Sequence, residues 1–202
     1  MIGIINYGLG NVGSICNMLK KLQIKNILLD ANSNYDSIDK LILPGVGSFD
    51  DGMNLLKKNN LIEILNQKVL IEKIPILGIC LGMQLMTKSS EEGHLKGLGW
   101  IDGTVHKFKF ENNDIKIPHM GWNDVIPSKE SALFMNLNEE ARFYHVHSYY
   151  VSLNQIEGII AETNYGGKFT SSFNFDNIYG VQFHPEKSHK FGKQLLLNFS
   201  KI

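Results

Sequence analysis

Short apolar runs alternate with helical patterns over the first ninety residues, and this alternation constrains the fold more than any other feature of the sequence. The apolar runs have the length of buried strands and lie at residues 2–6, 27–29, 41–43 and 75–79. Helical patterns follow or separate them at residues 14–22, 51–58, 61–72 and from Cys80 through Met86. Strand–helix alternation of this kind predicts a central, largely parallel sheet with helices on both faces.

The second half of the chain is richer in strand patterns, several of them alternating with a period of two. Strands are predicted at residues 100–110, 115–126, 142–153, 158–162 and 179–183, and two or three of them should add to the main sheet in antiparallel fashion. A last helix, residues 189–200, would turn Phe191, Leu195, Leu196 and Phe199 toward the core. Without a repeat or a linker, residues 1–202 should form one three-layer α/β/α domain with a mixed sheet.

The charge balance and the cysteine count exclude several classes of protein. Lys plus Arg and Asp plus Glu number 20 each, so no overall field favours nucleic acid or an acidic membrane as a partner. Cys16 and Cys80 are too few for a disulfide framework. The first ten residues lack a signal-peptide pattern, and no apolar run has the length of a membrane span. We expect a cytoplasmic protein with both thiols reduced.

A glycine-rich turn follows the first apolar run and offers one functional hypothesis. Residues 8–13 read G-L-G-N-V-G and open the first helix, and Asp30 lies at the end of the second strand. This spacing matches a dinucleotide-binding fingerprint, with the acidic residue placed for a ribose. The same glycines also suit a tight strand–helix turn that binds nothing. A nucleotide-binding module is therefore one alternative, although little chain remains for a separate substrate domain.

A second pattern places a cysteine where a nucleophile would lie. Residues 76–84 read I-L-G-I-C-L-G-M-Q, so Cys80 stands between two glycines, after a buried strand and before a helix. A sharp turn of this kind projects a reactive side chain, and backbone N–H groups of the helix start can face a developing oxyanion. The competing interpretation is a buried structural cysteine.

The partners that such a nucleophile needs occur a hundred residues later. Residues 180–186 read G-V-Q-F-H-P-E at the end of a late strand. His184 can accept and return a proton, and Glu186 can fix its tautomer and stabilise the imidazolium. Each motif alone is weak, but an elbow cysteine and a downstream histidine–acid pair each require the other. Together they predict a Cys80–His184–Glu186 triad.

With these motifs the sequence resembles the class I, triad-type glutamine amidotransferases. Within that family it is most similar to the glutaminase subunits of imidazole glycerol phosphate synthases. The similarity is carried by P-G-V-G-S-F at 44–49, P-H-M-G-W-N at 118–123, H-V-H-S-Y-Y-V at 145–151 and H-P-E-K-S at 184–188. The fold that this resemblance implies is the three-layer α/β/α domain expected above.

The resemblance also implies an activity and a role for particular residues. L-glutamine would be hydrolysed through a thioester on Cys80. The oxyanion and the substrate would be bound by Gly45, Val46, Gly47, Leu81, Gln84, His147, Ser148 and Tyr149. Ammonia would pass to a separate (β/α)₈ cyclase subunit in a heterodimer, for histidine biosynthesis. The contact with that cyclase would involve Asn11, His119, Met120 and Trp122, and no cofactor or metal is implied.

Two departures from the family leave the acceptor pathway open. His145 stands where relatives typically have an aromatic residue, and Thr163 where many have Cys. The alternative is a paralogous glutaminase subunit that supplies ammonia to an enzyme modifying cell-surface sugars. His145 and His147 form an H-x-H pair on one face of a strand, but two ligands fall short of the three or four that zinc requires. No metal site is expected.

Overall fold

The computed structural model describes residues 1–111, 114–127, 130–137 and 141–202. Its main sheet has the order β2-β1-β3-β4-β13-β12-β10-β6-β5, with β11 and β8 attached at β12. The first five strands in this order are parallel: β2 (Asn26–Leu29), β1 (Ile2–Ile5), β3 (Lys40–Leu43), β4 (Ile76–Ile79) and β13 (Ile178–Val181). The parallel sheet predicted for the first half is confirmed.

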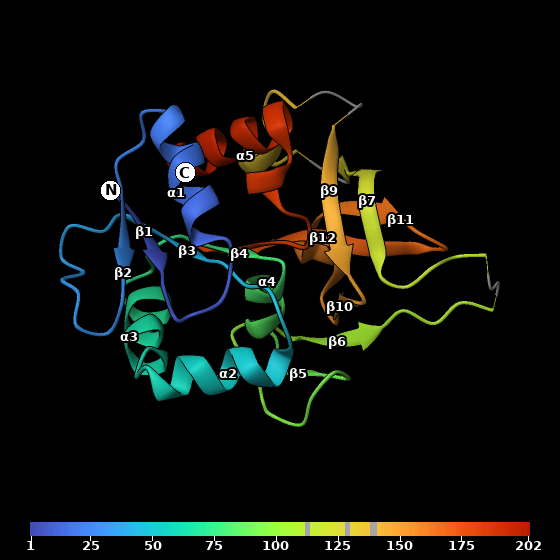
Figure 1. Cartoon of the computed structure of the whole chain (residues 1–202), viewed down its shortest axis with the longest axis horizontal. Coiled ribbons are helices and arrows are strands. Elements are labelled where there is room, and N and C mark those ends of the chain that lie inside the picture. The colour runs from blue at the N-terminus through green and yellow to red at the C-terminus, as the bar shows by residue number, and fades with distance from the viewer. Residues whose placement is uncertain (112–113, 128–129, 138–140) are drawn as a thin grey trace.

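Helices cover both faces of this parallel region, as Figure 1 shows. One face carries α1 (Val12–Lys21) and α5 (His189–Lys201), and the other carries α2 (Phe49–Lys58), α3 (Ile62–Asn66) and α4 (Leu81–Leu85). Alternate strand residues fill the two cores: Ile2 and Ile4 pack on the α1 side, while Ile5 packs on the α2 side. The predicted three layers are therefore present.

Two predictions for this half need correction. The strand at 27–29 was expected to be buried, but Ile27 and Leu28 are 44% and 42% exposed because β2 is the edge strand of the sheet. The helix predicted over 61–72 is not uniform, since α3 continues into the π-helix η1 (Gln67–Ile71).

The second half forms more antiparallel structure than the sequence indicated. Strands β12 (Lys168–Phe175), β10 (Tyr149–Leu153) and β6 (Gly103–Lys107) extend the sheet, with β5 (Ser89–Ser90), β11 (Ile159–Asn164) and β8 (Ile126–Pro127) at its borders. No strand was predicted at β12, the eight-residue strand beside β13. Its Thr170, Ser171 and Ser172 are buried. This central strand therefore lacks the apolar pattern by which a buried strand is predicted.

The single strand predicted over 142–153 is two strands in two sheets. It divides at Ser148 into β9 (Arg142–His147) and β10. Strand β9 pairs with β7 (His119–Asp124) in a separate two-stranded antiparallel ribbon. The 3-10 helices η2 (Ala132–Phe134), η3 (Ile156–Gly158) and η4 (Pro185–Lys187) complete the described elements. No helix in the described part of the chain is long and apolar enough to cross a membrane.

Candidate active site

Cys80 occupies a strained turn between β4 and α4. Its backbone has φ 53° and ψ −108°, a conformation rarely adopted outside glycine. The turn is held on both sides: Cys80 N donates to Val181 O at 2.8 Å, and a Cβ on Gly82 would lie 1.9 Å from Leu43 O. Glycine is required at Gly82 by this close approach. Strain that the surrounding structure enforces is typical of functional sites, and here it confirms the predicted elbow geometry.

His184 and Glu186 lie beside this turn because β13 and β4 are neighbouring parallel strands. Ile79 pairs with Val181, so the residues that follow each strand emerge at the same sheet edge. His184 Nδ1 lies 2.8 Å from Glu186 Oε1, and both side chains are about 1% exposed. Glu186 is thus the hydrogen-bond partner that orients the imidazole.

The pKa of His184 is shifted upward by its two neighbours. Burial alone would lower this pKa, but the interactions with Cys80, and then with Glu186, raise it to about 10. His184 Nε2 makes no hydrogen bond of full geometry, although it is buried. Cys80 is nevertheless close enough for a hydrogen bond with His184 to count among the causes of the raised pKa.

The pKa of Glu186 moves in the opposite direction. Burial raises it, but His184 and the Asn11 amide outweigh burial and leave it below its ordinary value. Asn11 Nδ2 donates to Glu186 Oε1 at 2.8 Å. A lowered pKa keeps Glu186 ionised, as an orienting carboxylate must be.

A cavity of about 500 Å³ opens beside the triad. Its lining includes Asn11, Val46, Gly47, Cys80, Leu81, Gln84, Glu92, Pro118, Val146, His147, Ser148, Tyr149, His184 and Lys187. All the predicted substrate-binding residues except Gly45 line it. Gly45 lies just behind, where a Cβ would be 2.7 Å from Leu81 Cβ and 2.9 Å from the Tyr7 hydroxyl.

Comparison with known proteins assigns this geometry to a family. Residues 3–201 match the family described as glutamine amidotransferase class-I. The chain belongs to the class-I glutamine amidotransferases. Its relatives include the imidazole glycerol phosphate synthase subunits HisH 2 of Methanococcus maripaludis, 57% identical over 100% of this chain and 99% of the relative, and HisH 2 of Pseudomonas aeruginosa, 47% identical over 100% of both. The HisH subunit of Leptospira borgpetersenii is 46% identical over 100% of both.

Solved structures agree on the fold of this amidotransferase. PurLQS from Thermotoga maritima matches with a TM-score of 0.71 and 19% identity, covering 99% of this chain and 97% of that one. A glutamine amidotransferase from the same organism matches with a TM-score of 0.66 and 18% identity, covering 99% and 82%. The three-layer fold and the predicted membership in the HisH branch of the class-I amidotransferases are therefore confirmed.

The glycine turn at residues 8–13 serves the active site of the amidotransferase. A Cβ on Gly10 would lie 2.8 Å from Pro44 Cβ, so this glycine allows the turn to pack on the loop 44–47. Asn11 from the same turn reaches Glu186. These contacts account for Gly10 and Asn11 without a nucleotide, and the family is one of enzymes rather than nucleotide-binding modules.

Five residues of the site were not among those predicted: Gln182, Glu92, Pro118, Val146 and Lys187. Gln182 donates to Cys80 Sγ at 3.6 Å and accepts from Gln84 Nε2 at 3.1 Å. Gln182 lies two residues before His184, so the period of a strand could have placed both on one face. Glu92 and Lys187 also line the cavity. No signal in the sequence marked Glu92, because it comes from a loop that folds back on α2.

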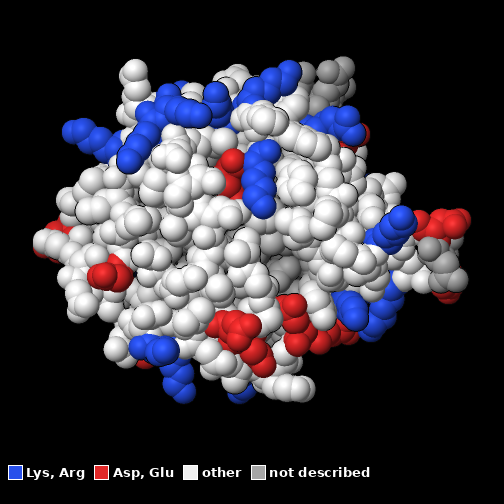
Figure 2. Space-filling model, in the orientation of Figure 1, with Lys and Arg blue, Asp and Glu red and all other residues white. Residues whose placement is uncertain are grey.

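The predicted partner-facing residues are not all at the surface. Met120 and Trp122 are 61% and 40% exposed, and Trp122 stacks on His189 with ring centroids 5.4 Å apart. His119 is 2% exposed, so its expected direct contact with a partner is corrected: the side chain points inward because residues alternate along β7. Figure 2 shows charged side chains gathered near the borders of one face, Lys along α1 and α5, around a largely uncharged middle.

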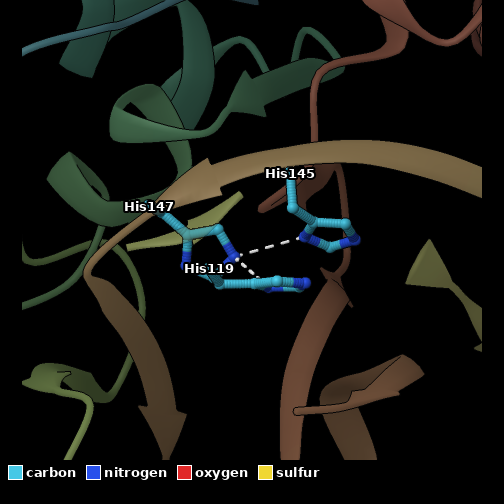
Figure 3. A group of neighbouring side chains, drawn as sticks. All are labelled: His119, His145 and His147. Atoms are coloured by element: carbon cyan, nitrogen blue, oxygen red, sulfur yellow. Dashed lines mark hydrogen bonds between the residues drawn. The ribbon is translucent and has the colours of Figure 1, made fainter. Parts of the chain in front are cut away.

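His119 instead joins His145 and His147 in a buried cluster, shown in Figure 3. His147 Nε2 lies 3.1 Å from His119 Nδ1 and 3.2 Å from His145 Nδ1. The expectation that only two histidines could approach a metal is wrong, because the pairing of β7 with β9 brings the third.

Proposed function

We propose that Cys80, His184 and Glu186 hydrolyse L-glutamine to glutamate and ammonia for imidazole glycerol phosphate synthesis in the histidine pathway. The observation that carries the proposal is the strained Cys80 turn beside a buried His184–Glu186 pair whose Nδ1 and Oε1 atoms lie 2.8 Å apart. The whole chain, residues 1–202, would act as one glutaminase domain in the cytoplasm.

The reaction follows from the charges of this pair. The Cys80 thiolate attacks the carboxamide carbon of glutamine, and the C–N bond breaks as His184 passes its proton to the leaving ammonia. The remaining glutamyl thioester is then attacked by water, from which His184 removes a proton. Thiolate departure releases glutamate and restores the starting state.

The oxyanion of each tetrahedral intermediate would be stabilised by backbone N–H groups. Leu81 begins α4, so its N–H has no partner within the helix. The loop formed by Gly45, Val46 and Gly47 would supply a second donor. Tyr7 Oη donates to Pro44 O at 2.8 Å and so restrains one end of this loop. A loop change that completes the hole could alter the rate by about a hundredfold or more, the usual effect of one such donor.

The cavity offers groups for the rest of the substrate. Gln84 Nε2 donates to Tyr149 O at 3.2 Å, which places this amide beside the backbone of Ser148 and Tyr149. Glu92 brings a carboxylate to the lining of this cavity, and it is suited to the α-ammonium group of glutamine. Burial raises the pKa of Glu92, while its bond from Phe49 N favours the ionised form.

Ammonia would pass to a cyclase subunit of (β/α)₈ fold without entering bulk water, where most of it would be protonated at neutral pH. Exposed Met120 and Trp122 on β7 support a docking surface close to the cavity, because neighbouring Pro118 lines the cavity itself. The names of the HisH relatives support a synthase as the partner assembly.

The test is transfer of labelled nitrogen. The purified chain, its co-expressed cyclase and amide-¹⁵N-glutamine should place ¹⁵N in the imidazole product even when unlabelled ammonium is present. The same pair should restore growth of a histidine auxotroph that lacks its own glutaminase subunit. Unlabelled product, or failure to complement together with binding to a sugar-modifying synthetase, would transfer the assignment to the surface-sugar pathway.

A further inference from the structure

The ribbon of β7 and β9 places three histidines on one face. His119 pairs directly with His147, and Gly121 pairs with His145, so the inward positions of the two strands are adjacent. The His145 ring is stacked on that of His119, with centroids 4.4 Å apart. In Figure 3 the rings of His145 and His119 both lie beside one nitrogen of His147, and the dashed lines run to it. The scaffold is a hydrogen-bonded ribbon rather than a loop, which holds side chains in fixed positions.

The spacing of the ring nitrogens suits a metal ion. One ligand nitrogen from each histidine lies within 4.8 Å of the others, and two of the separations are 3.1 and 3.2 Å. Zinc–nitrogen bonds of about 2.0–2.1 Å in tetrahedral geometry place ligand nitrogens about 3.3–3.4 Å apart. The rings of His119 and His145 are stacked, with centroids 4.4 Å apart and planes 23° apart, so one of them must turn for the three lone pairs to meet at one point.

Hydrogen bonding alone leaves the cluster incompletely satisfied. His147 Nδ1 lies 2.8 Å from Tyr149 O and must carry a proton to bond it, so His147 Nε2 offers one lone pair. The nitrogens of His119 and His145 both approach that lone pair. His119 Nδ1 carries a proton, because its Nε2 faces the Asn123 amide at 3.1 Å. His145 is left to compete for the same acceptor, and its Nε2 is buried without a partner.

The donor chemistry is also that of a ligand set. The three imidazoles are buried, and each offers one ring nitrogen to the cluster. A neutral imidazole is the form of histidine that coordinates metals. An all-imidazole set without carboxylates selects zinc and its transition-metal neighbours over magnesium or calcium.

We propose that His119, His145 and His147 bind a divalent transition-metal ion, with zinc as the reference ion, leaving its fourth position to water. Binding through His119 Nδ1 moves the ring proton to Nε2, so the Asn123 amide must turn to present its oxygen. Binding at His147 Nε2 would polarise the Nδ1–H bond to Tyr149 O, which Gln84 also contacts. The metal would thus stiffen one wall of the glutamine cavity.

The experiment measures metal binding in a background that lacks the catalytic thiol. Cys80→Ala is the starting protein, because a thiolate beside His184 is itself a metal ligand, and no histidine tag is used. Zinc affinity is measured by competition with a chromogenic chelator, and cobalt(II) binding by its visible absorption. One ion per chain is expected. His145→Phe keeps an aromatic ring in the space and should weaken binding by about a hundredfold or more, since loss of an outer partner alone costs up to that much.

Two further variants make the result specific. His106→Phe makes the same substitution at a strand histidine outside the cluster, and its zinc affinity should equal that of the background protein. Asn123→Asp supplies an acceptor for His119 Nε2–H and should raise zinc affinity by about tenfold. Absence of saturable binding in the Cys80→Ala protein, or equal binding in His145→Phe and His106→Phe, would overturn the proposal.

Discussion

Asn11 donates a hydrogen bond to the same oxygen of Glu186 that bonds His184, although Asn11 and Glu186 lie 175 residues apart in the chain. Asn11 therefore acts on the triad through Glu186, as a positioning residue. Its amide contributes to the low pKa of that carboxyl. This contact links the glycine turn, the loop packed on it and the catalytic base into one unit.

Substitution of Asn11 should weaken the triad without removing it. Asn11→Ala deletes a hydrogen bond to a charged group, and we expect kcat for glutamine to fall by about tenfold. Asn11→Asp adds a like charge beside Glu186 and should lower kcat further. The acid limb of the pH–kcat profile should move to higher pH in both variants, because both raise the pKa of Glu186. An unchanged pH profile would indicate that Asn11 has only a structural role.

The catalytic triad predicts a graded loss of glutaminase activity. Cys80→Ala should abolish hydrolysis, and His184→Ala should reduce kcat by on the order of 10⁴-fold or more. The loss of kcat in Glu186→Ala should be roughly ten- to a hundredfold smaller than in His184→Ala, since Glu186 orients the base and transfers no proton. A diazo-ketone analogue of glutamine should label Cys80 and not Cys16, whose pKa burial raises. Cys16→Ala is the matched control, and modification of Cys16 alone would refute Cys80 as nucleophile.

Close packing at the elbow makes Gly82 intolerant of a side chain. Gly82→Ala would place Cβ 1.9 Å from Leu43 O, a backbone atom that cannot move alone, and should cost about 3 kcal/mol or more in the free energy of unfolding. Gly13 lies in α1, and a Cβ there would meet no neighbouring atom within 4 Å. Gly13→Ala should therefore raise the free energy of unfolding by about 0.5–1 kcal/mol. Urea denaturation of both variants gives the comparison. Similar stabilities would contradict the packing argument.

The buried histidines predict a loss of stability in mild acid. In the unfolded chain these rings take up protons near pH 6.5, whereas in the folded protein His119 and His147 do so only near 4 and 3. The unfolded state thus binds more protons as the pH falls below about 6.5, and stability declines until about pH 3. His145→Phe removes one such group. The free energy of unfolding is measured between pH 6.5 and 5 with a chelator present. Its slope against pH should be shallower in His145→Phe than in His94→Phe by up to about 1.4 kcal/mol per pH unit.

Trp122 should anchor the cyclase. Its indole is 40% exposed and already ordered by stacking on His189, so little side-chain entropy is lost on binding. Trp122→Ala should weaken the complex by about 2 kcal/mol, or roughly thirtyfold in Kd, while glutamine hydrolysis by the isolated chain stays unchanged. Ile156→Ala, at another exposed apolar residue, is the control for calorimetric titration. Equal affinities for the two variants would exclude this surface.

The triad could be predicted because its parts follow strands of clear apolar pattern. Cys80 and His184 come after β4 and β13, and carboxyl ends of neighbouring parallel strands meet at one edge. The family segments then indicated the loop at 44–47 and the substrate residues. Polar strand β12 was missed, since its buried serines carry no apolar signal.

Contacts that depend on strand register could not be predicted from the sequence. Nothing local indicates that the chain leaves one sheet at Ser148 and enters another, and the approach of His119 to His145 and His147 follows only from that division. The same holds for Asn11, whose partner is set by the packing of two distant turns. Patterns along one strand are visible in a sequence, whereas pairings between strands require the register.

The alternation of β7 has a consequence for how this family can vary. Met120 and Trp122 point outward while His119 points inward, so a one-residue insertion or deletion before Trp122 would exchange the two faces. Such a change would bury Met120 and Trp122 and expose His119 in a single step. Single substitutions in β7 can be tolerated, but insertions and deletions within it cannot. Natural variants of this enzyme should therefore differ in residue identity along β7 and β9. Insertions and deletions should occur in the connections beyond the ends of these strands.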